Sequence, residues 1–150
     1  MIPELDQHGL LPPGVWHCTL TEAQSRFATT AHRRDLWRGL GQFIATHVPQ
    51  VPGVVALYID GSYTTSKPAP ADIDVIADLA DLQGADPLAA ILHAKLRRAE
   101  FRQIYGVDFW VRHPELPLDL AKTFQQVGDK QASRLGLHPT HPKGILRVRP

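Results

Sequence analysis

The sequence predicts one α+β (α/β) domain in which helices flank a mixed β-sheet. Two observations predict this fold class. Apolar runs of strand length alternate along the chain with amphipathic helical segments. The 150 residues, 43% hydrophobic and 21% charged, suffice for one buried core and exclude a disordered chain. We therefore expect a single domain over residues 1–150, with an irregular N-terminal lead over about residues 1–18.

Two helices are predicted in the first third of the chain. Thr19 followed by Glu22 is a capping-box pattern, which predicts a helix over residues 20–27. After Thr30, apolar residues recur at steps of three and four as far as residue 48, which predicts a longer helix with Trp37 in the core. We expect Arg33 on the opposite, solvated face of that helix.

The rest of the chain alternates strands and helices. Continuous β-branched and aromatic runs predict strands covered on both faces, and Asp86 followed by proline predicts the start of a helix. The predicted elements are strands over 54–59, 73–77, 104–111 and 144–149, and helices over 87–101 and 118–127.

Two aspartates at the start of the second predicted strand carry the main chemical signal. Side chains alternate along a strand, so Asp72 and Asp74 point to the same face. Close carboxylates repel one another, and a hard divalent cation removes that conflict. Asp108, in the third predicted strand, would complete a site able to hold two ions. The pattern predicts that these three carboxylates bind Mg²⁺ or Mn²⁺.

A glycine and a serine follow the first predicted strand directly. Gly61 allows the backbone to approach a phosphate closely, and Ser62 offers a hydroxyl and an amide donor. Lys67, in the loop before Asp72, either reaches a phosphate or is an ordinary solvated lysine. Each motif alone also has a simpler interpretation: the Gly-Ser pair is a turn, Asp72 and Asp74 lie on a half-exposed edge strand, and Asp108 is a salt-bridged strand residue.

The order of these motifs resembles the signature of the DNA polymerase beta-type nucleotidyltransferase superfamily. In that superfamily Gly-Ser or Gly-Gly follows a first strand, Asp-x-Asp comes next, and a third acidic residue lies on a later strand. Here the resemblance covers roughly residues 54 to 111. The chain is also similar to an uncharacterised family of short bacterial proteins with this minimal fold, on the segments Ile2–Glu4, Gly9–Gly14, Gly61–Asp74 and Lys143–Ile145.

The resemblance implies an enzyme that transfers NMP from a nucleoside triphosphate to a hydroxyl. It implies that Asp72 and Asp74 ligate the metals and that Asp108 binds the second metal and helps activate the attacking hydroxyl. Gly61 and Ser62 would hold the phosphates. The chain has no room for the helical domain that many members append, and its loop after Gly-Ser carries prolines, so the nucleotide and the acceptor stay open.

Acceptors in such families include RNA (tRNA among them), proteins and small molecules. Short stand-alone domains resemble members of toxin–antitoxin or phage-defence pairs. The alternative is a binding module or antitoxin that keeps the fold without catalysis and neutralises a partner protein. The presence of all three carboxylates favours catalysis.

The overall charge is balanced, with 16 Lys and Arg against 15 Asp and Glu. From residue 120 onward, however, six Lys and Arg face a single Asp. This stretch is either a solvated basic edge or an anion-binding rim for RNA, a triphosphate or a partner protein. The single cysteine, and the absence of a signal peptide or apolar span in the sequence, lead us to expect a soluble, cytoplasmic protein with no membrane partner.

Overall fold

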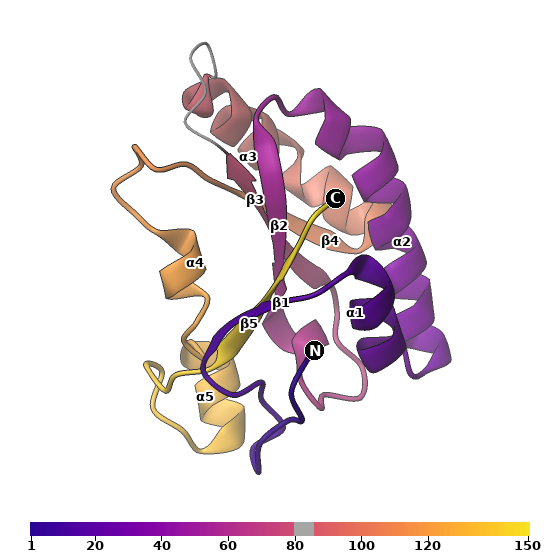
Figure 1. The fold of residues 1–150 in the computed structure, drawn as a ribbon, viewed down its shortest axis with the longest axis vertical. Helices are drawn as coiled ribbons and strands as arrows, with labels where there is room; N and C mark the ends of the chain where they lie inside the picture. The colour runs from indigo at the N-terminus through magenta and orange to yellow at the C-terminus, as the bar shows by residue number, and fades with distance from the viewer. Residues whose placement is uncertain (80–85) are drawn as a thin grey trace.

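The computed structural model describes residues 1–79 and 86–150. Helices flank a five-stranded mixed sheet, as the sequence predicts, with the strand order β1-β5-β2-β3-β4 (Figure 1). The strands are β1 (Gly14–His17), β2 (Val54–Asp60), β3 (Ile73–Leu79), β4 (Val107–Arg112) and β5 (Gly144–Val148). The helices are α1 (Leu20–Phe27), α2 (Ala31–His47), α3 (Pro87–Tyr105), α4 (Leu120–Thr123) and α5 (Asp129–Leu135).

The sheet combines two parallel and two antiparallel strand pairs. Strand β1 runs parallel to β5, and β3 runs parallel to β4. The central strand β2 is antiparallel to both of its neighbours, β5 and β3. Helix α3 connects β3 to β4, which is the usual way to join two parallel strands. In the strand order, β4 is the last of the described strands on its side of the sheet.

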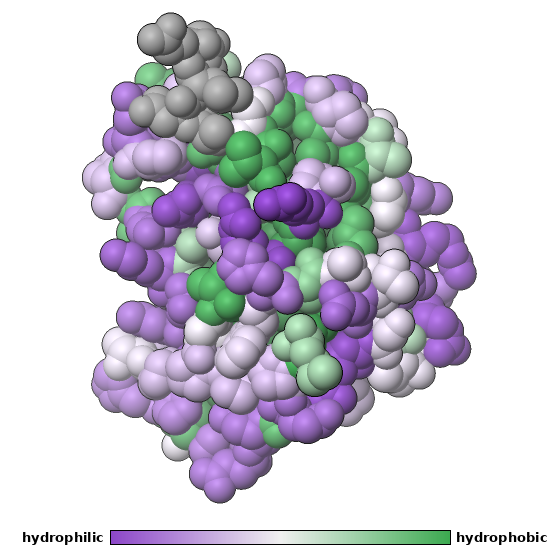
Figure 2. Space-filling model, viewed as in Figure 1, coloured by the Kyte–Doolittle hydropathy of each residue, from purple (hydrophilic) through white to green (hydrophobic). Residues whose placement is uncertain are grey.

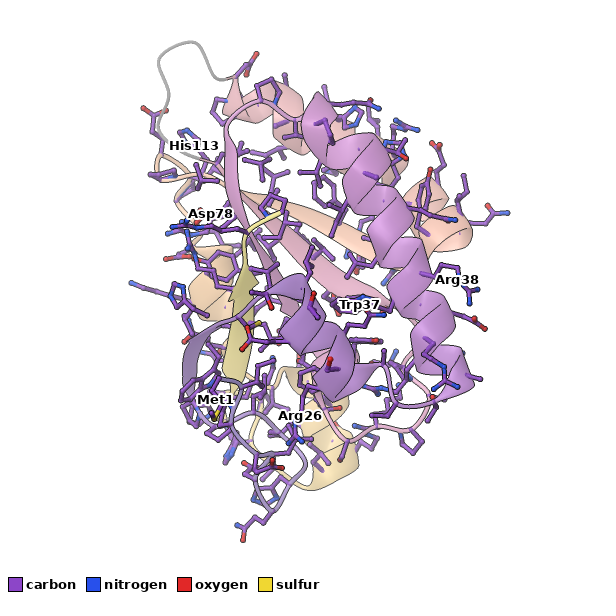
Figure 3. All side chains as sticks on the ribbon, turned by 45° about the vertical axis from the view of Figure 1, so that its right-hand side comes forward. Met1, Arg26, Trp37, Arg38, Asp78 and His113 are labelled. Carbon is purple, nitrogen blue, oxygen red and sulfur yellow. The ribbon has the colours of Figure 1, made fainter. Side chains whose placement is uncertain are left out.

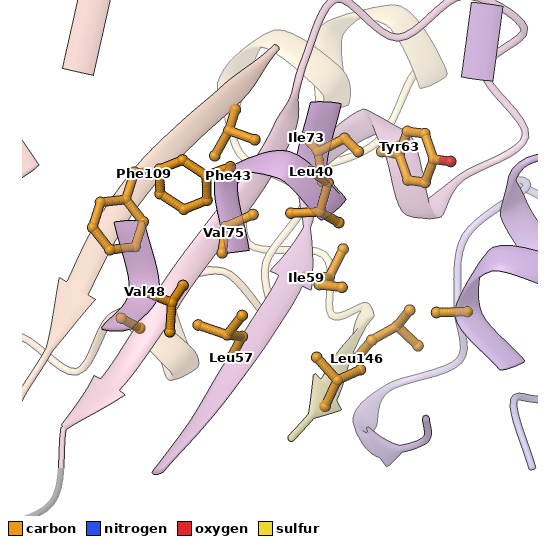
Figure 4. Close-up of a cluster of buried hydrophobic side chains, with 14 of the residues drawn as sticks. Leu40, Phe43, Val48, Leu57, Ile59, Tyr63, Ile73, Val75, Phe109 and Leu146 are labelled. Carbon is orange, nitrogen blue, oxygen red and sulfur yellow. The ribbon is translucent and has the colours of Figure 1, made fainter. Parts of the chain in front are cut away.

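One face of the sheet carries the main hydrophobic core. Alternate residues of the strands, such as Ile59, Val75 and Phe109, pack there against α2 and α3 (Figure 4). The rings of Phe43 and Phe109 meet edge to face with 5.0 Å between centroids. Trp37 points from α2 toward the sheet and is buried, as predicted from the helical periodicity, whereas the adjacent Arg38 points to solvent (Figure 3).

The other face carries a smaller apolar cluster and most of the buried charge. Tyr58, Ile76 and Ile145 pack there with Ala121 of α4. The carboxylates of β2, β3 and β4 lie on this face, because they alternate with the core residues along each strand. The molecular surface in Figure 2 is mainly hydrophilic. Hydrophobic residues gather there over α2 and the upper part of β2.

Local sequence signals set several element boundaries as predicted. Helix α1 spans residues 20–27, and both bonds of its capping box form: Glu22 N donates to Thr19 Oγ1 at 3.1 Å, and Thr19 N donates to Glu22 Oε2 at 2.8 Å. Asp86 caps α3 by accepting from Ala89 N at 3.0 Å. Polar side chains that satisfy the first free amides of a helix fix its start.

Other boundaries differ from the prediction. The N-terminal lead contains β1, which forms only because β5 is available as a parallel partner far along the chain. Helix α3 extends to Tyr105, where Gly106 (φ +66°) ends it, so β4 begins at Val107. The predicted helix over 118–127 is reduced to α4, and α5 forms where no element was predicted.

Helix α3 leaves a row of leucines exposed. Leu88, Leu92 and Leu96, which stand four residues apart, are 73%, 55% and 75% exposed. The helix instead buries Ala94 and Phe101 against the core. None of the helices in the described part of the chain combines the length and apolarity needed to cross a membrane.

Candidate functional site

Four carboxylates gather where β2, β3 and β4 lie side by side. The register pairs Asp60 with Asp74 across β2 and β3, and Asp74 with Asp108 across β3 and β4. Side chains of directly paired residues share one face of a sheet. Asp72 lies two residues before Asp74. The structure thus brings together Asp72, Asp74 and Asp108, the three predicted metal ligands, and adds Asp60, which was not predicted as a ligand.

Asp74, the central member of this cluster, forms no ion pair with the described residues, and the charge of Lys143 only partly offsets the charges of its acidic neighbours. Within residues 1–79 and 86–150, no hydrogen bond or ion pair reaches its carboxylate. Burial raises its pKa to about 7, and the charges of Asp60, Asp72 and Asp108 push in the same direction. Asp74 is therefore the group in the cluster that a cation would stabilise most.

Asp108 is held by two arginines of α3. The Arg98 guanidinium binds it through two nitrogens, with Nη2 2.8 Å from Oδ2, and Arg102 Nη2 lies 2.9 Å from the same oxygen. Arg102 also reaches Asp72 Oδ2 at 3.2 Å. Asp108 thus fits its simpler interpretation, a salt-bridged strand residue. The sequence does carry a signal for this contact, because Arg98 and Arg102 are one helical turn apart on the helix that leads into β4.

Asp60 forms a buried ion pair with Lys143. The two side chains are 2% and 4% exposed, and the Lys143 ammonium donates to Asp60 Oδ1. Burial raises the pKa of Asp60, and the Lys143 charge opposes that shift. Lys143 was predicted as part of the basic C-terminal stretch, but it lies inside the molecule. Sequence reasoning missed the pair because its partners are 83 residues apart.

The loop after β2 is held in place by a buried arginine. Arg33 was predicted to be solvated, but it is 4% exposed and donates to main-chain oxygens of Phe27 at 2.6 Å, Lys67 at 2.7 Å and Tyr63. Its guanidinium also lies 4.6 Å from the centroid of the Tyr63 ring. Main-chain carbonyls thus take the place of a carboxylate partner, which an analysis of charge patterns along the sequence does not detect.

Gly61 brings this loop into direct contact with the carboxylate cluster. Its φ is +75°, a conformation that favours glycine. A Cβ atom at this position would overlap Oδ2 of Asp74. The glycine is therefore required both for the turn after β2 and for the approach of the main chain to Asp74.

A pocket of about 360 Å³ opens beside Asp72 and Asp74. Ser62 and Lys67 line it from the loop, Arg102 from α3, and Lys130 and Arg134 from α5. Four cationic side chains and three carboxylates, of Asp72, Asp74 and Asp129, therefore line this space. Lys130 and Arg134 are the members of the basic C-terminal stretch that this site uses. The lining residues are Ser62, Lys67, Ala71, Asp72, Asp74, Arg102, Val127, Gly128, Asp129, Lys130, Gln131 and Arg134.

The carboxylates fit a divalent cation in part. Asp72 and Asp74 face a pocket, and the raised pKa of Asp74 reflects a repulsion that a cation would relieve. The oxygens of Asp108 are instead bound by guanidinium groups. Among the residues that the structure describes, no set of three or more His, Cys, Asp or Glu side chains is arranged to hold a metal ion.

A second group of charges lies on the same face, farther along β3 and β4. Asp78 pairs with Arg112 in the register, and Arg112 Nη1 lies 2.6 Å from Asp78 Oδ1. Arg112 Nε also donates to Asp119 at 2.9 Å, and Arg147 lies 3.4 Å from Asp78. The hydrogen bonds that Arg112 donates to Asp119 and Asp78 raise the pKa of Arg112, and the bond that Asp119 accepts from Arg112 lowers the pKa of Asp119. Here each charge has a partner.

Comparison with known proteins identifies one family. Residues 3–149 match the family described as "Family of unknown function (DUF6932)". No curated protein and no solved structure matches the chain.

Proposed function

The chain belongs to the DUF6932 family, and we propose that it is a nucleotidyltransferase of the DNA polymerase beta-type fold that transfers NMP from a nucleoside triphosphate to a hydroxyl. The observation that carries the proposal is the position of Asp74. It is a half-buried carboxylate between Asp60 and Asp108, it forms no ion pair with the described residues, and a pocket lined by Lys and Arg side chains opens beside it. Strongly perturbed carboxylates in a cleft are typical of functional sites.

The pocket supplies what a triphosphate requires. Lys67, Lys130 and Arg134 line it, and none of the three forms an ion pair with the described residues. Ser62 adds a hydroxyl to the lining of the pocket. A chain of phosphates carries several negative charges, which free Lys and Arg side chains bind through charge-assisted hydrogen bonds. In this proposal Lys67 is a phosphate ligand.

A divalent cation fits between the phosphates and the carboxylates. Asp72 and Asp74 would hold it, because Mg²⁺ is commonly bound by one or two carboxylates together with substrate phosphates. The cation would supply charge neutralisation at the phosphorus under attack. Asp108 joins them as a ligand only if Arg98 and Arg102 turn away from it. Both guanidinium groups would then be free to bind the incoming phosphates.

The transfer conserves atoms and charge. The acceptor oxygen forms a bond to the α-phosphorus, the bond to the bridging oxygen breaks, and pyrophosphate leaves with the bonding electrons. The acceptor proton is released to solvent. In-line displacement of this kind depends on positioning and on neutralising the charge of the phosphates, which is the role of Ser62, Lys67, Lys130 and Arg134 here.

Thermal melts test nucleotide binding directly. Each nucleoside triphosphate, with and without Mg²⁺, is added to the wild-type protein and to a Lys130→Ala/Arg134→Ala variant, whose changes lie on the exposed side of α5. At a concentration one hundred times Kd, binding adds about 2.7 kcal/mol to the free energy of unfolding. We expect this shift for wild type and a smaller one for the variant. If no triphosphate raises the melting temperature in the presence of Mg²⁺, the proposal is wrong.

Mass spectrometry then tests the transfer. RNA and protein are incubated with the enzyme and each isotopically labelled triphosphate, and products are searched for the mass of one added NMP. The Asp74→Asn variant is the matched control, because it keeps the shape of the side chain and removes its charge. Labelling that persists in this variant would argue against the proposed site.

A second candidate function is a non-catalytic module that binds a partner protein, as in an antitoxin. The observation that favours it is the row of exposed leucines on α3, since monomeric proteins seldom leave such a row uncovered. Replacing Leu92 and Leu96 by Glu distinguishes the two functions. Loss of partner binding with intact nucleotide binding would support the module.

A further inference from the structure

A second pocket lies on the other side of Asp108, along the outer side of β4. Its volume is about 370 Å³, and α3, β4 and the segment after β4 form its walls. The walls are mainly apolar, with Ile91 and Ala94 on one side and Leu116 and Leu118 on the other. The pocket therefore favours an apolar guest, unlike the basic pocket beside Asp72 and Asp74.

The floor of this pocket is the edge of the sheet. Phe109, Trp110 and Val111 line it, and β4 is the last strand in the order β1-β5-β2-β3-β4. No described strand pairs with its outer side. An edge strand keeps a row of main-chain donors and acceptors that an extended peptide can satisfy. The indole N–H of Trp110 is also buried without a described partner, which leaves one more donor at this wall.

The charges at the pocket point to the same kind of guest. Lys95 stands at the rim and forms no ion pair with the described residues, so it can receive an acidic side chain. Arg98 lines the pocket, lies with Cζ 3.7 Å from the centroid of the Trp110 ring, and binds Asp108. This arginine thus connects the pocket to the carboxylate cluster. RNA would need more cations than these two, because its binding depends on neutralising phosphates.

We propose that this pocket docks an extended protein segment that has an apolar anchor with an acidic residue beside it. The proposal rests on the proposed function for one further step: the docked segment carries the hydroxyl that receives the NMP. A segment paired with β4 would run about 4.8 Å from that strand, the spacing of neighbouring strands in a sheet. Its side chains on the polar face would stand next to Asp108, opposite the side on which the phosphates bind.

The docking test uses a displayed library of random twelve-residue peptides, without nucleotide. Enriched peptides are synthesised, and their affinities are measured for wild type, Ala94→Met and Leu118→Glu, which alter the pocket. Ile104→Glu is the control, because Ile104 is exposed on α3 and neither lines the pocket nor belongs to the row of leucines. We expect peptides with an apolar anchor, at least tenfold weaker binding to the two pocket variants, and unchanged binding to the control. Thermal melts verify that each variant is folded.

Two further measurements decide the occupant and the link to catalysis. Amide NMR shifts of Phe109, Trp110 and Val111 should move on peptide binding. Failure to enrich any pocket-dependent peptide, or tighter pocket-dependent binding of a random twenty-nucleotide RNA, would overturn the proposal. Peptide docking in a protein that binds no triphosphate would leave the docking site standing and count against the enzyme. Nucleotide binding without peptide docking would support the enzyme and overturn the docking site.

Discussion

Strands β3 and β4 carry two cross-strand pairs of charged residues, here called rungs, on one face of the sheet. The paired charges are alike in one rung and opposite in the other. At the first, Asp74 stands beside Asp108; four residues farther along, Asp78 stands beside Arg112. The second rung is a matched network in which each charge has a partner. At the first, two arginines and a lysine hold the outer carboxylates and leave Asp74 unmatched.

Under the proposed function, the difference separates a structural role for Asp78 from a functional role for Asp74. Matched charges lower each other's energy, so the Asp78 rung stabilises the packing of α4 against the sheet. The Asp74 rung instead keeps a carboxylate where its ionised form is unfavourable, as shown by its raised pKa of about 7. Unfavourable charges of this kind are typical of functional sites, where selection for function and not for stability retains them. Changes at the Asp74 rung and at the buried pair beside it test this distinction, and the Asp78 rung is the reference for transfer activity and for Mg²⁺ binding.

The largest expected effect is on transfer activity. Asp74→Asn should lower the rate at least a thousandfold, because it removes the charge that would hold the cation against the phosphates. Asp78→Asn should leave the rate within a few fold. Its free energy of unfolding should fall by about 1–3 kcal/mol, because Arg112 loses a buried charged partner. Steady-state rates and chemical denaturation of both variants provide the measurement. Equal rates for the two variants would erase the functional distinction between the rungs.

The next largest effect concerns the buried pair behind the Asp74 rung. Lys143→Met should cost about 3–5 kcal/mol of the free energy of unfolding, because Asp60 is left buried without its cation. The double variant Asp60→Asn/Lys143→Met should recover most of that loss. Lys130→Met, on the exposed side of α5, is the matched control and should change stability by less than about 0.5 kcal/mol. A mild effect of Lys143→Met would mean that the pair is not needed for folding.

The third prediction concerns pH. The pKa of Asp74 rises from 3.8 to about 7 on folding, so the folded state binds this proton more tightly than the unfolded state. The stabilisation that comes from this bound proton is therefore fully present below about pH 4, and it is lost as the pH rises to about 7. Relative to wild type in EDTA, Asp74→Asn should therefore gain stability over this window, reaching on the order of 4 kcal/mol above pH 7. Denaturation at pH 5, 6, 7 and 8 measures it, and a constant difference between the proteins would contradict the assignment.

The smallest effect is that of the cation alone. Mg²⁺ at ten times its Kd should add about 1.4 kcal/mol to the stability of wild type and of Asp78→Asn. It should add nothing to Asp74→Asn. Calorimetric melts with Mg²⁺, and with an equal ionic strength of NaCl as reference, separate binding from general screening. A shift of the same size in all three proteins would show that the cation does not distinguish the rungs.

Local signals in the sequence predicted much of the fold. The capping box placed α1 correctly, and the 3.6-residue periodicity placed α2 and buried Trp37. The apolar runs located β2, β3 and β5 within one or two residues. Strand β1 and helix α5 escaped prediction because their stability comes from partners distant in sequence and not from periodicity. The three predicted carboxylates lie together because Asp72 and Asp74 are two residues apart and Asp108 pairs with Asp74 across β3 and β4.

The charges around those carboxylates were not predicted, although the four-residue spacing of Arg98 and Arg102 was a signal for their shared contact. Arg98 and Arg102 looked like ordinary residues near the end of a helix, and Lys143 looked like part of a basic tail. Arg33 was expected to be solvated because it lies on the helix face opposite the apolar residues, yet it binds main-chain carbonyls. Pairing across dozens of residues depends on which elements become neighbours, and charge counts along a chain carry no information on that.

The attachment of Arg33 to the loop after β2 has a consequence for affinity. A loop that must become ordered around a ligand loses conformational entropy, which weakens binding. Arg33 fixes the main chain at Tyr63 and Lys67 before any ligand arrives, so this entropy loss belongs to folding and not to association. Preorganisation of this kind makes α2, which contributes no side chain to the basic pocket, a determinant of how tightly that pocket can bind. Natural variation along the buried side of α2 could therefore tune affinity without altering any residue that contacts the ligand.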